Sequence, residues 1–232
     1  MVDSSLLALA PLWYVAFLLS LTCHEAAHAW AAEKLGDPTA ALGGQVSLNP
    51  LPHIQREMFG TVVVPILSLL IGGWMIGWAS APYNPLWQQR YPKRAAWMAL
   101  AGPTANLLLV VLAAVLIHLG IGTGWLERPE SLRFTQIVAP GASPASEAIA
   151  LFLSILFSEN LLLMAFNLIP LPPLDGATAI GLLLPDETAL KVLDFLRQPG
   201  FSIVGLILAW RFFGDLFTPL FFWCGRALYG VF

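Results

Sequence analysis

Thr22-Cys23-His24-Glu25-Ala26-Ala27-His28-Ala29-Trp30 ends an apolar run that begins near Leu6. The length of this run predicts a helix, and His24 and His28 share one face of it because four residues are slightly more than one turn. Their imidazoles are therefore placed to bind one metal ion. Glu25 is rotated by about 100° from His24, so its carboxylate lies beside the ion and is available to a bound water molecule.

Zinc is the ion that this pattern favours. Two imidazoles and a carboxylate leave a fourth position open for water, whose pKa then falls to about 7. In a soluble helix, His-Glu-x-x-His is often no more than a solvated face. Here the surrounding residues are mainly Leu, Ala, Val and Phe, and three ionisable groups are costly in hydrocarbon unless they serve a site. The setting therefore predicts one bound Zn²⁺ ion.

The composition is that of an integral membrane protein. Of 232 residues, 58% are apolar and 11% are charged, against about 25% charged in ordinary soluble domains, and the mean hydropathy is +0.75. The net charge of −3 argues against a nucleic-acid partner. Spanning a bilayer takes about 20 mostly apolar residues, and five segments reach this length: Leu6–Leu35, Met58–Ala79, Ala95–Leu119, Ala148–Ile169 and Phe201–Trp223.

These segments predict an all-α polytopic membrane protein. No soluble domain fits between them, so residues 1–232 are expected to form one domain, which ends with a membrane segment over 201–232. In that last segment, the spacing of Arg211 and Asp215 predicts that they neutralise one another on an inward face.

The segment Met58–Ala79 is apolar enough to cross, but the charges that flank it argue against a simple span. Arg56 precedes it, whereas Arg90, Lys93 and Arg94 follow it. The positive-inside rule therefore places both of its ends in the cytoplasm. A re-entrant or broken segment that is shielded by protein satisfies the charge rule and the apolar composition together.

A short strand is expected between Gly43 and Pro50. This stretch shows a weak alternation of apolar and polar residues, bounded by Gly and Pro. Its edge would be exposed, and an extended peptide could add to that edge near Gln45 to Leu48 through backbone hydrogen bonds.

A zinc site with an open position commonly has three protein ligands, so a distant His, Asp or Glu must supply the third. The candidates are His53, His118, Glu159 and Asp175. If the second apolar segment does not cross, the next two segments run outward and back, and Asp175 reaches the cytoplasmic side near the His pair. His118 then lies on the opposite side, and Glu159 lies several turns deeper. His53 remains a candidate, although its loop position favours a surface histidine.

Asn167-Leu168-Ile169-Pro170-Leu171-Pro172-Pro173-Leu174-Asp175-Gly176 leads to that carboxylate. Three prolines in four positions cannot continue a helix, so the backbone is predicted to leave the preceding helix in an extended form. Asp175 could simply cap the next helix. An irregular backbone between two apolar helices is tolerated only where protein or a cavity lines it, however, and this favours a site.

Three stretches together resemble the signatures of the site-2 protease family of intramembrane zinc metallopeptidases. They are His24 to His28, Gly102-Pro103-Thr104-Ala105-Asn106, and Asn167 to Pro170 with Leu174-Asp175-Gly176, in the order found in the family. The short chain and the segment Ser47 to His53 resemble the compact bacterial members, which lack an inserted PDZ or regulatory nucleotide-sensing domain.

The resemblance implies a role for each motif residue. The metal ligands would be His24, His28 and Asp175. Glu25 would be the general base and acid, and Asn167 would contact the substrate backbone near the scissile bond. The resemblance also implies a three-helix catalytic core within residues 6–184, whereas the part of the chain after Pro185 varies within the family. Glu159 matches none of the motifs.

The activity expected from these residues is hydrolysis of peptide bonds in membrane-spanning proteins near the cytoplasmic face of a bacterial inner membrane. Two other classes stay open. One is a non-enzymatic membrane protein, such as a metal-binding scaffold or a transporter. The other is a different membrane zinc peptidase in which Glu159 is the third ligand.

Overall fold

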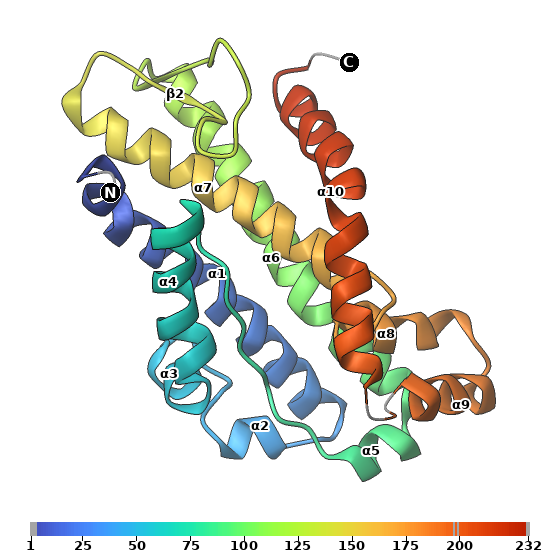
Figure 1. Cartoon of the computed structure of the whole chain (residues 1–232). Coiled ribbons are helices and arrows are strands. Elements are labelled where there is room, and N and C mark those ends of the chain that lie inside the picture. Colours follow the sequence, from blue (N-terminus) through green and yellow to red (C-terminus); the bar gives the residue numbers. More distant parts are fainter. Residues whose placement is uncertain (1–3, 197, 199, 231–232) are drawn as a thin grey trace.

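The computed structural model describes residues 4–196, 198 and 200–230, and four of its helices are long and apolar enough to cross a membrane. They are α1 (Ser4–Leu35), α6 (Pro92–Gly122), α7 (Pro144–Asn167) and α10 (Phe201–Leu228). Successive spans run down, up, down and up, so the start of α1 and the end of α10 both lie at the upper end (Figure 1). The predicted all-α polytopic membrane protein is confirmed.

The first three of these helices, α1, α6 and α7, form the three-helix core. Ala32 of α1 and Ala95 of α6 are fully buried in one cluster, where their small side chains let the two helices approach closely. Phe17 of α1 packs with Ile155 of α7 in a second cluster. Helix α1 therefore contacts both α6 and α7, and its second half lies inside the bundle.

The segment after α1 follows the course expected of a re-entrant segment. A π-helical turn (Phe59–Val63) and helix α4 (Val64–Gly72) rise beside α1, but together they are too short to be a candidate span. The helix ends at Gly73, which takes the left-handed φ of 76° that glycine tolerates best. The chain then descends without regular structure to α5 (Pro85–Arg90) at the lower end (Figure 1).

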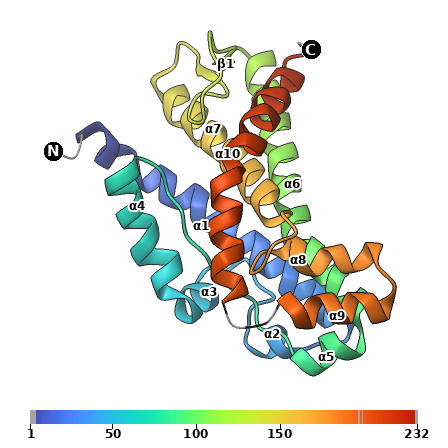
Figure 2. The same cartoon turned by 45° about the vertical axis from the view of Figure 1, so that its right-hand side comes forward.

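Short helices gather at the lower end of the bundle. Both views place α2 (Thr39–Leu42), α3 (Leu51–Arg56), α5 and α9 (Asp186–Leu196) there (Figures 1 and 2). Asp37 joins two parts of this end, since one carboxylate oxygen accepts from the backbone N of Thr39 at 3.0 Å and the other from that of Asn84 at 2.6 Å. The return of the re-entrant segment is thereby fixed to the turn that follows α1.

The predicted strand between Gly43 and Pro50 is wrong. These residues form turns and bends, and the side chain of Gln45 is buried, where its amide donates to the Ser80 carbonyl at 3.3 Å. The weak alternation therefore reflects the burial of one polar side chain, that of Gln45. This stretch has no strand edge to which a peptide could add. The two strands found among the described residues are β1 (Leu126–Glu127) and β2 (Ala139–Pro140), an antiparallel pair in the loop between α6 and α7.

The stretch after α7 is not extended as predicted. It closes two turns, in which the backbone N of Leu171 donates to Ile169 O at 2.8 Å and that of Leu174 to Leu171 O at 3.0 Å. These turns fold the chain back before α8 (Asp175–Ala179) and the 3₁₀ helix η2 (Ile180–Leu183). A Cβ on Gly176 would collide with the Leu168 and Ile169 carbonyls, so only glycine permits this return.

We expect a cysteine placed at either end of the re-entrant segment to react from one side of the membrane. Leu51→Cys and Leu86→Cys replace exposed residues before and after it, and Trp125→Cys replaces an exposed residue at the upper end. An impermeant maleimide should label the first two from one side and the third from the other. The parent chain, with Cys23 and Cys224 half-buried, is the control. Labelling of Leu51→Cys and Leu86→Cys from opposite sides would mean that the segment crosses.

Candidate metal centre

Two imidazoles and a carboxylate converge between α1 and α8. The Oδ2 atom of Asp175 lies 3.2 Å from His24 Nε2 and 3.3 Å from His28 Nε2, and the two Nε2 atoms are 3.0 Å apart. One potential ligand atom from each side chain lies within 4.8 Å of the others. His24 and His28 are buried and Asp175 is largely buried. The structure thus brings together residues 150 positions apart, as the topology predicts.

Both histidines are oriented through their Nδ1 atoms by helix α6. His28 Nδ1 lies 2.8 Å from the Met98 carbonyl, and His24 Nδ1 lies 2.6 Å from the side-chain oxygen of Asn106. Since each acceptor requires a proton on Nδ1, both Nε2 atoms keep a lone pair for a ligand. Second-shell contacts of this kind fix the tautomer and the ring orientation of histidines that bind metals.

Asn106 belongs to a buried polar chain that joins the three core helices. Its amide donates to the Asn160 side-chain oxygen at 2.8 Å, and the Asn160 amide donates to Ser20 Oγ at 2.8 Å. Ser20 donates in turn to the Ala16 carbonyl at 2.7 Å. Asn106, Asn160 and Ser20 are completely buried. The chain satisfies polar groups that would otherwise be costly inside a membrane protein.

Gly102 makes the close approach of α6 to the His pair possible. A Cβ at this position would lie 2.6 Å from His24 Nε2 and closer still to His28 Nε2. Any larger residue would occupy the space between the two rings. The Gly-Pro-Thr-Ala-Asn stretch therefore contributes a gap at Gly102 and a hydrogen-bond acceptor at Asn106.

Lys93 holds the segment that carries Asp175 at its far end. Its ammonium donates to the Gly181 carbonyl at 2.9 Å, to the Leu182 carbonyl at 3.2 Å and to the Leu184 carbonyl. A cation at the C-terminal carbonyls of a helix satisfies groups that lack intrahelical partners. Asp175 is thus fixed from one side by the turns that follow α7 and from the other by α6.

The donor set fits a zinc ion. Oδ2 of Asp175 is shielded from solvent and has no hydrogen-bond partner among the described residues, which is costly unless a cation or a proton meets it. Two nitrogen donors and one carboxylate oxygen match the ligands of zinc sites that keep one position open.

Glu25 is positioned differently from the three potential ligands. It is buried, 5% exposed, and its carboxylate forms no hydrogen bond or ion pair within the described part of the chain. A carboxylate without a protein partner, next in sequence to His24, is free to exchange a proton with water at the centre.

The other predicted site residues do not join the cluster. Asn167 ends α7, and its amide donates to the Leu163 carbonyl at 3.1 Å. His118 is exposed near the upper end of α6, as predicted. The prediction that His53 is a surface histidine is wrong, because it is 2% exposed and its Nε2 lies 3.1 Å from the Ser47 carbonyl. Glu159 is buried elsewhere on α7 and offers no ligand atom to the group.

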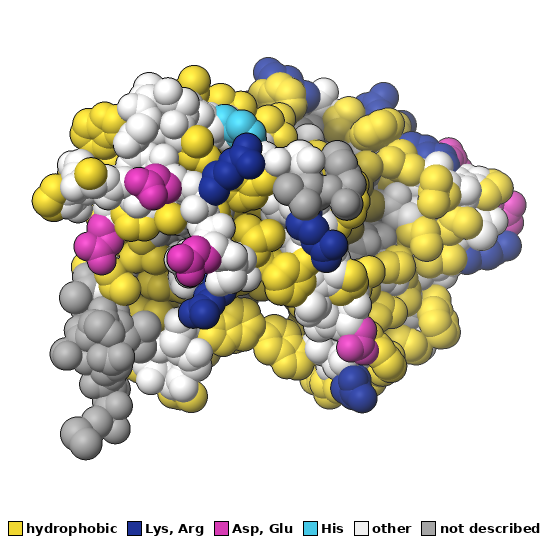
Figure 3. All heavy atoms as spheres, turned by 90° about the horizontal axis from the view of Figure 1, so that it is seen from above, with side chains coloured by type: hydrophobic (Ala, Val, Ile, Leu, Met, Phe, Trp, Pro, Cys, Tyr) yellow, Lys and Arg dark blue, Asp and Glu magenta, His cyan; other side chains and the backbone are white. Residues whose placement is uncertain are grey.

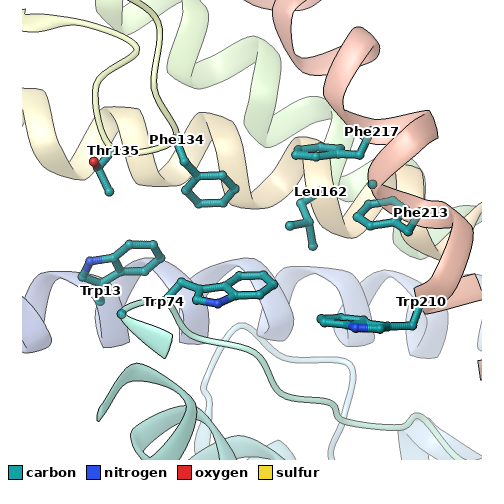
Figure 4. Close-up of a pocket in the computed structure, with 10 residues that line it drawn as sticks. Trp13, Trp74, Phe134, Thr135, Leu162, Trp210, Phe213 and Phe217 are labelled. Atoms are coloured by element: carbon teal, nitrogen blue, oxygen red, sulfur yellow. The ribbon is translucent and has the colours of Figure 1, made fainter. Parts of the chain in front are cut away.

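An apolar groove of about 500 Å³ lies away from these residues. Trp13 of α1, Trp74 of the re-entrant segment and Trp210 of α10 line it (Figure 4). Trp74 and Trp210 stack with their ring centroids 6.0 Å apart. None of the residues that line the groove is a candidate ligand, so the acid–base and metal chemistry lies elsewhere.

Comparison with known families assigns the class of protein. Residues 12–194 match the model of peptidase family M50. The chain therefore belongs to this family, the site-2 proteases, and the predicted resemblance is confirmed. It is a membrane zinc metalloprotease, and its cofactor is Zn²⁺.

Individual relatives carry names of the same kind. The chain is 34% identical over 187 residues to "Putative zinc metalloprotease YwhC" of Bacillus subtilis, an alignment that covers 80% of this chain and 75% of the relative. It is 29% identical over 207 residues to "Putative zinc metalloprotease Rip2" of Mycolicibacterium smegmatis, with 89% and 70% covered. The Rip2 protein of Mycobacterium tuberculosis is 30% identical over 173 residues, with 74% and 57% covered. No solved structure matches the chain significantly.

Removal of the Asn106 side-chain acceptor should weaken metal binding. We expect Asn106→Leu to lower the affinity for zinc by about 10- to 100-fold, because His24 loses the contact that fixes its tautomer. Thr104→Val is the matched control, since Thr104 is exposed on the same helix and bonds only to the carbonyl of Leu100. Zinc affinity is measured by chelator competition in detergent. Equal affinities for the two variants would show that Asn106 does not orient His24.

Proposed function

We propose that this zinc protease hydrolyses peptide bonds of membrane-spanning proteins near the cytoplasmic face of a bacterial inner membrane. The observation that carries the proposal is the convergence of His24, His28 and Asp175 inside a bundle of spanning helices. A site formed between such helices lies within the membrane, where substrates that are themselves in the bilayer can reach it. Residues 1–232 would act as one domain, with the core over 6–184.

The distribution of basic residues supports the orientation. Six basic residues described at the lower end are Lys34, Arg56, Arg90, Lys93, Arg94 and Lys191, whereas Arg128, Arg133 and Arg226 lie at the upper end. The positive-inside rule then makes the lower end cytoplasmic. His24 and His28 lie in the second half of α1, which runs toward this end.

In the proposed mechanism, His24, His28 and Asp175 hold the ion. A zinc ion held there supplies Lewis-acid activation of water and of the scissile carbonyl. Glu25 accepts a proton from the attacking water and returns it to the leaving amine. Asn167, at the end of α7, would bind the substrate backbone, which must leave its helical hydrogen bonds before attack. Its side-chain oxygen has no protein donor among the described residues and can accept from a substrate N–H.

Two other assignments compete with this one. A non-enzymatic scaffold or transporter requires zinc but not the proton transfer by Glu25. A peptidase with Glu159 as a ligand is disfavoured, because Asp175 and not Glu159 reaches the two imidazoles.

We expect Asp175→Ala to lose most bound zinc and Glu159→Gln to keep it. The first substitution removes the carboxylate oxygen that lies 3.2 Å from His24 Nε2 and 3.3 Å from His28 Nε2, whereas the second conserves the shape of a buried residue outside the cluster. Zinc content per chain is measured by elemental analysis of both purified variants. Retention by Asp175→Ala together with loss by Glu159→Gln would reverse the ligand assignment.

Glu25→Gln should keep zinc and abolish cleavage. The amide preserves the size of the side chain but cannot accept the proton of the water, so the rate should fall at least about 100-fold. The assay reconstitutes the protein in vesicles with a membrane-spanning test substrate and compares fragments, with zinc content measured in parallel. Wild-type cleavage by a zinc-loaded Glu25→Gln variant would exclude Glu25 as the general base.

A further inference from the structure

Two opposite charges are exposed halfway along α10. Arg211 and Asp215 are both solvent-accessible in the structure and lie in a helix apolar enough to span the bilayer. At 1.5 Å per residue, Arg211 stands about 15 Å from the start of α10 and Asp215 about 20 Å from its end. In the view from above, charged side chains are scattered among apolar ones (Figure 3). A charged pair in the middle of a spanning helix requires an explanation.

Both charges point away from the bundle. The middle of α10 packs against the protein through Ala209 and Phe213. Arg211 is two residues from each of them, which is about 200° around the helix. The prediction that Arg211 and Asp215 neutralise one another on an inward face is therefore wrong. Within the described ranges neither forms an ion pair, and the Arg211 guanidinium only lies 5.6 Å from the ring centroid of Phe212.

Lipid cannot satisfy these groups. Ionisable side chains within a membrane almost always face protein or water and pair with one another. A rotamer change could pair Arg211 with Asp215 within α10, but the remaining N–H groups of the guanidinium would still point into hydrocarbon. A second helix that carries complementary groups removes this cost.

The same face of α10 is shaped for close contact with another helix. Gly214 and Thr218 are spaced four residues apart beside the two charges. Gly214 borders the apolar groove on one side, but a Cβ built on it would meet nothing within 4 Å, so a second helix can approach it. Small residues at this spacing let two membrane helices approach closely. We call Arg211, Gly214, Asp215 and Thr218 together the α10 face.

We propose that the α10 face binds the same face of a second copy of this chain, with a two-fold axis along the membrane normal. Arg211 and Asp215 are about 6 Å apart along the helix, a distance that an extended arginine can bridge. In a two-fold pair of parallel helices, Arg211 then meets Asp215 of the partner subunit, and the reciprocal pair forms by symmetry. One acid and one base on the same face make it complementary to itself, which favours a second copy over an unrelated protein. The inference does not rest on the proposed function.

Disulfide crosslinking in native membranes tests the contact. Thr218→Cys, in a chain with Cys224→Ser, should form a homodimer on mild oxidation. Leu108→Cys in the same background replaces an exposed residue on α6 and should not. Equal crosslinking at the two positions would overturn the proposal, as would a Thr218→Cys product that contains a different protein. The Glu25→Gln substitution should leave crosslinking unchanged, which separates this result from any failure of the proposed activity.

Charge exchange identifies the partner. Arg211→Asp gives a face with two acids, and Asp215→Arg gives a face with two bases. Each variant alone should crosslink through Thr218→Cys no more than the Leu108→Cys control, while co-expression of the two with different tags should restore a mixed dimer. The double variant Arg211→Asp, Asp215→Arg should dimerise as the parent does and shows that the exchanged residues permit folding. Single variants that crosslink like the parent, or a mixed pair that fails while the double variant succeeds, would refute the reciprocal pairing.

Discussion

The close approach of α6 to α1 at Gly102 is the constraint on which the site depends. Only with a hydrogen atom at this position can the two imidazoles lie against the backbone of α6. At that separation His28 reaches the Met98 carbonyl and His24 reaches Asn106. The Nε2 atoms of both rings then face the same point, which Asp175 approaches from α8. A helix pair spaced by an ordinary side chain would keep the histidines but lose their common direction.

Polar residues inside this bundle fall into two groups. Asn106, Asn160 and Ser20 satisfy one another and join three helices, so they contribute to the structure of the core. Asp175 differs from them because its Oδ2 has no hydrogen-bond partner among the described residues. In a low-dielectric interior, hydrogen-bonded polar groups stabilise the fold, whereas unsatisfied polar groups are costly. An unsatisfied group therefore indicates that a ligand binds there. Glu159 is also buried with an unsatisfied Oε2, and nothing in the arrangement of the metal centre makes use of it.

Much of the fold could be predicted because the bilayer restricts what the sequence can do. Four spanning helices follow from apolar length, and the re-entrant segment follows from basic residues on both of its sides. The pairing of His24 with His28 follows from helical periodicity, and the arrival of Asp175 follows from the parity of the crossings. The conformation of Gly43 to Pro50 was harder to predict, because a weak alternation of apolar and polar residues does not reveal that the Gln45 side chain turns inward. The orientation of α10 was equally hidden, since charged residues on one face of a spanning helix do not show whether that face turns toward the bundle or away from it.

The role of Asn160 shows a further limit. Its only signal in the sequence is an amide in an apolar helix, and such an amide can bond to any neighbour. The structure shows that it supports Asn106, which in turn holds His24. That relation depends on the rotation of α7 relative to α6, and this rotation is set by packing throughout the core.

The anchoring of η2 by Lys93 also has a thermodynamic consequence. One ammonium binds the carbonyls that follow Asp175, and the tight return at Gly176 holds the residues beside it. The conformational entropy lost in ordering this carboxylate is therefore lost during folding rather than when an ion arrives. Preorganisation of this kind favours tight binding of the ion.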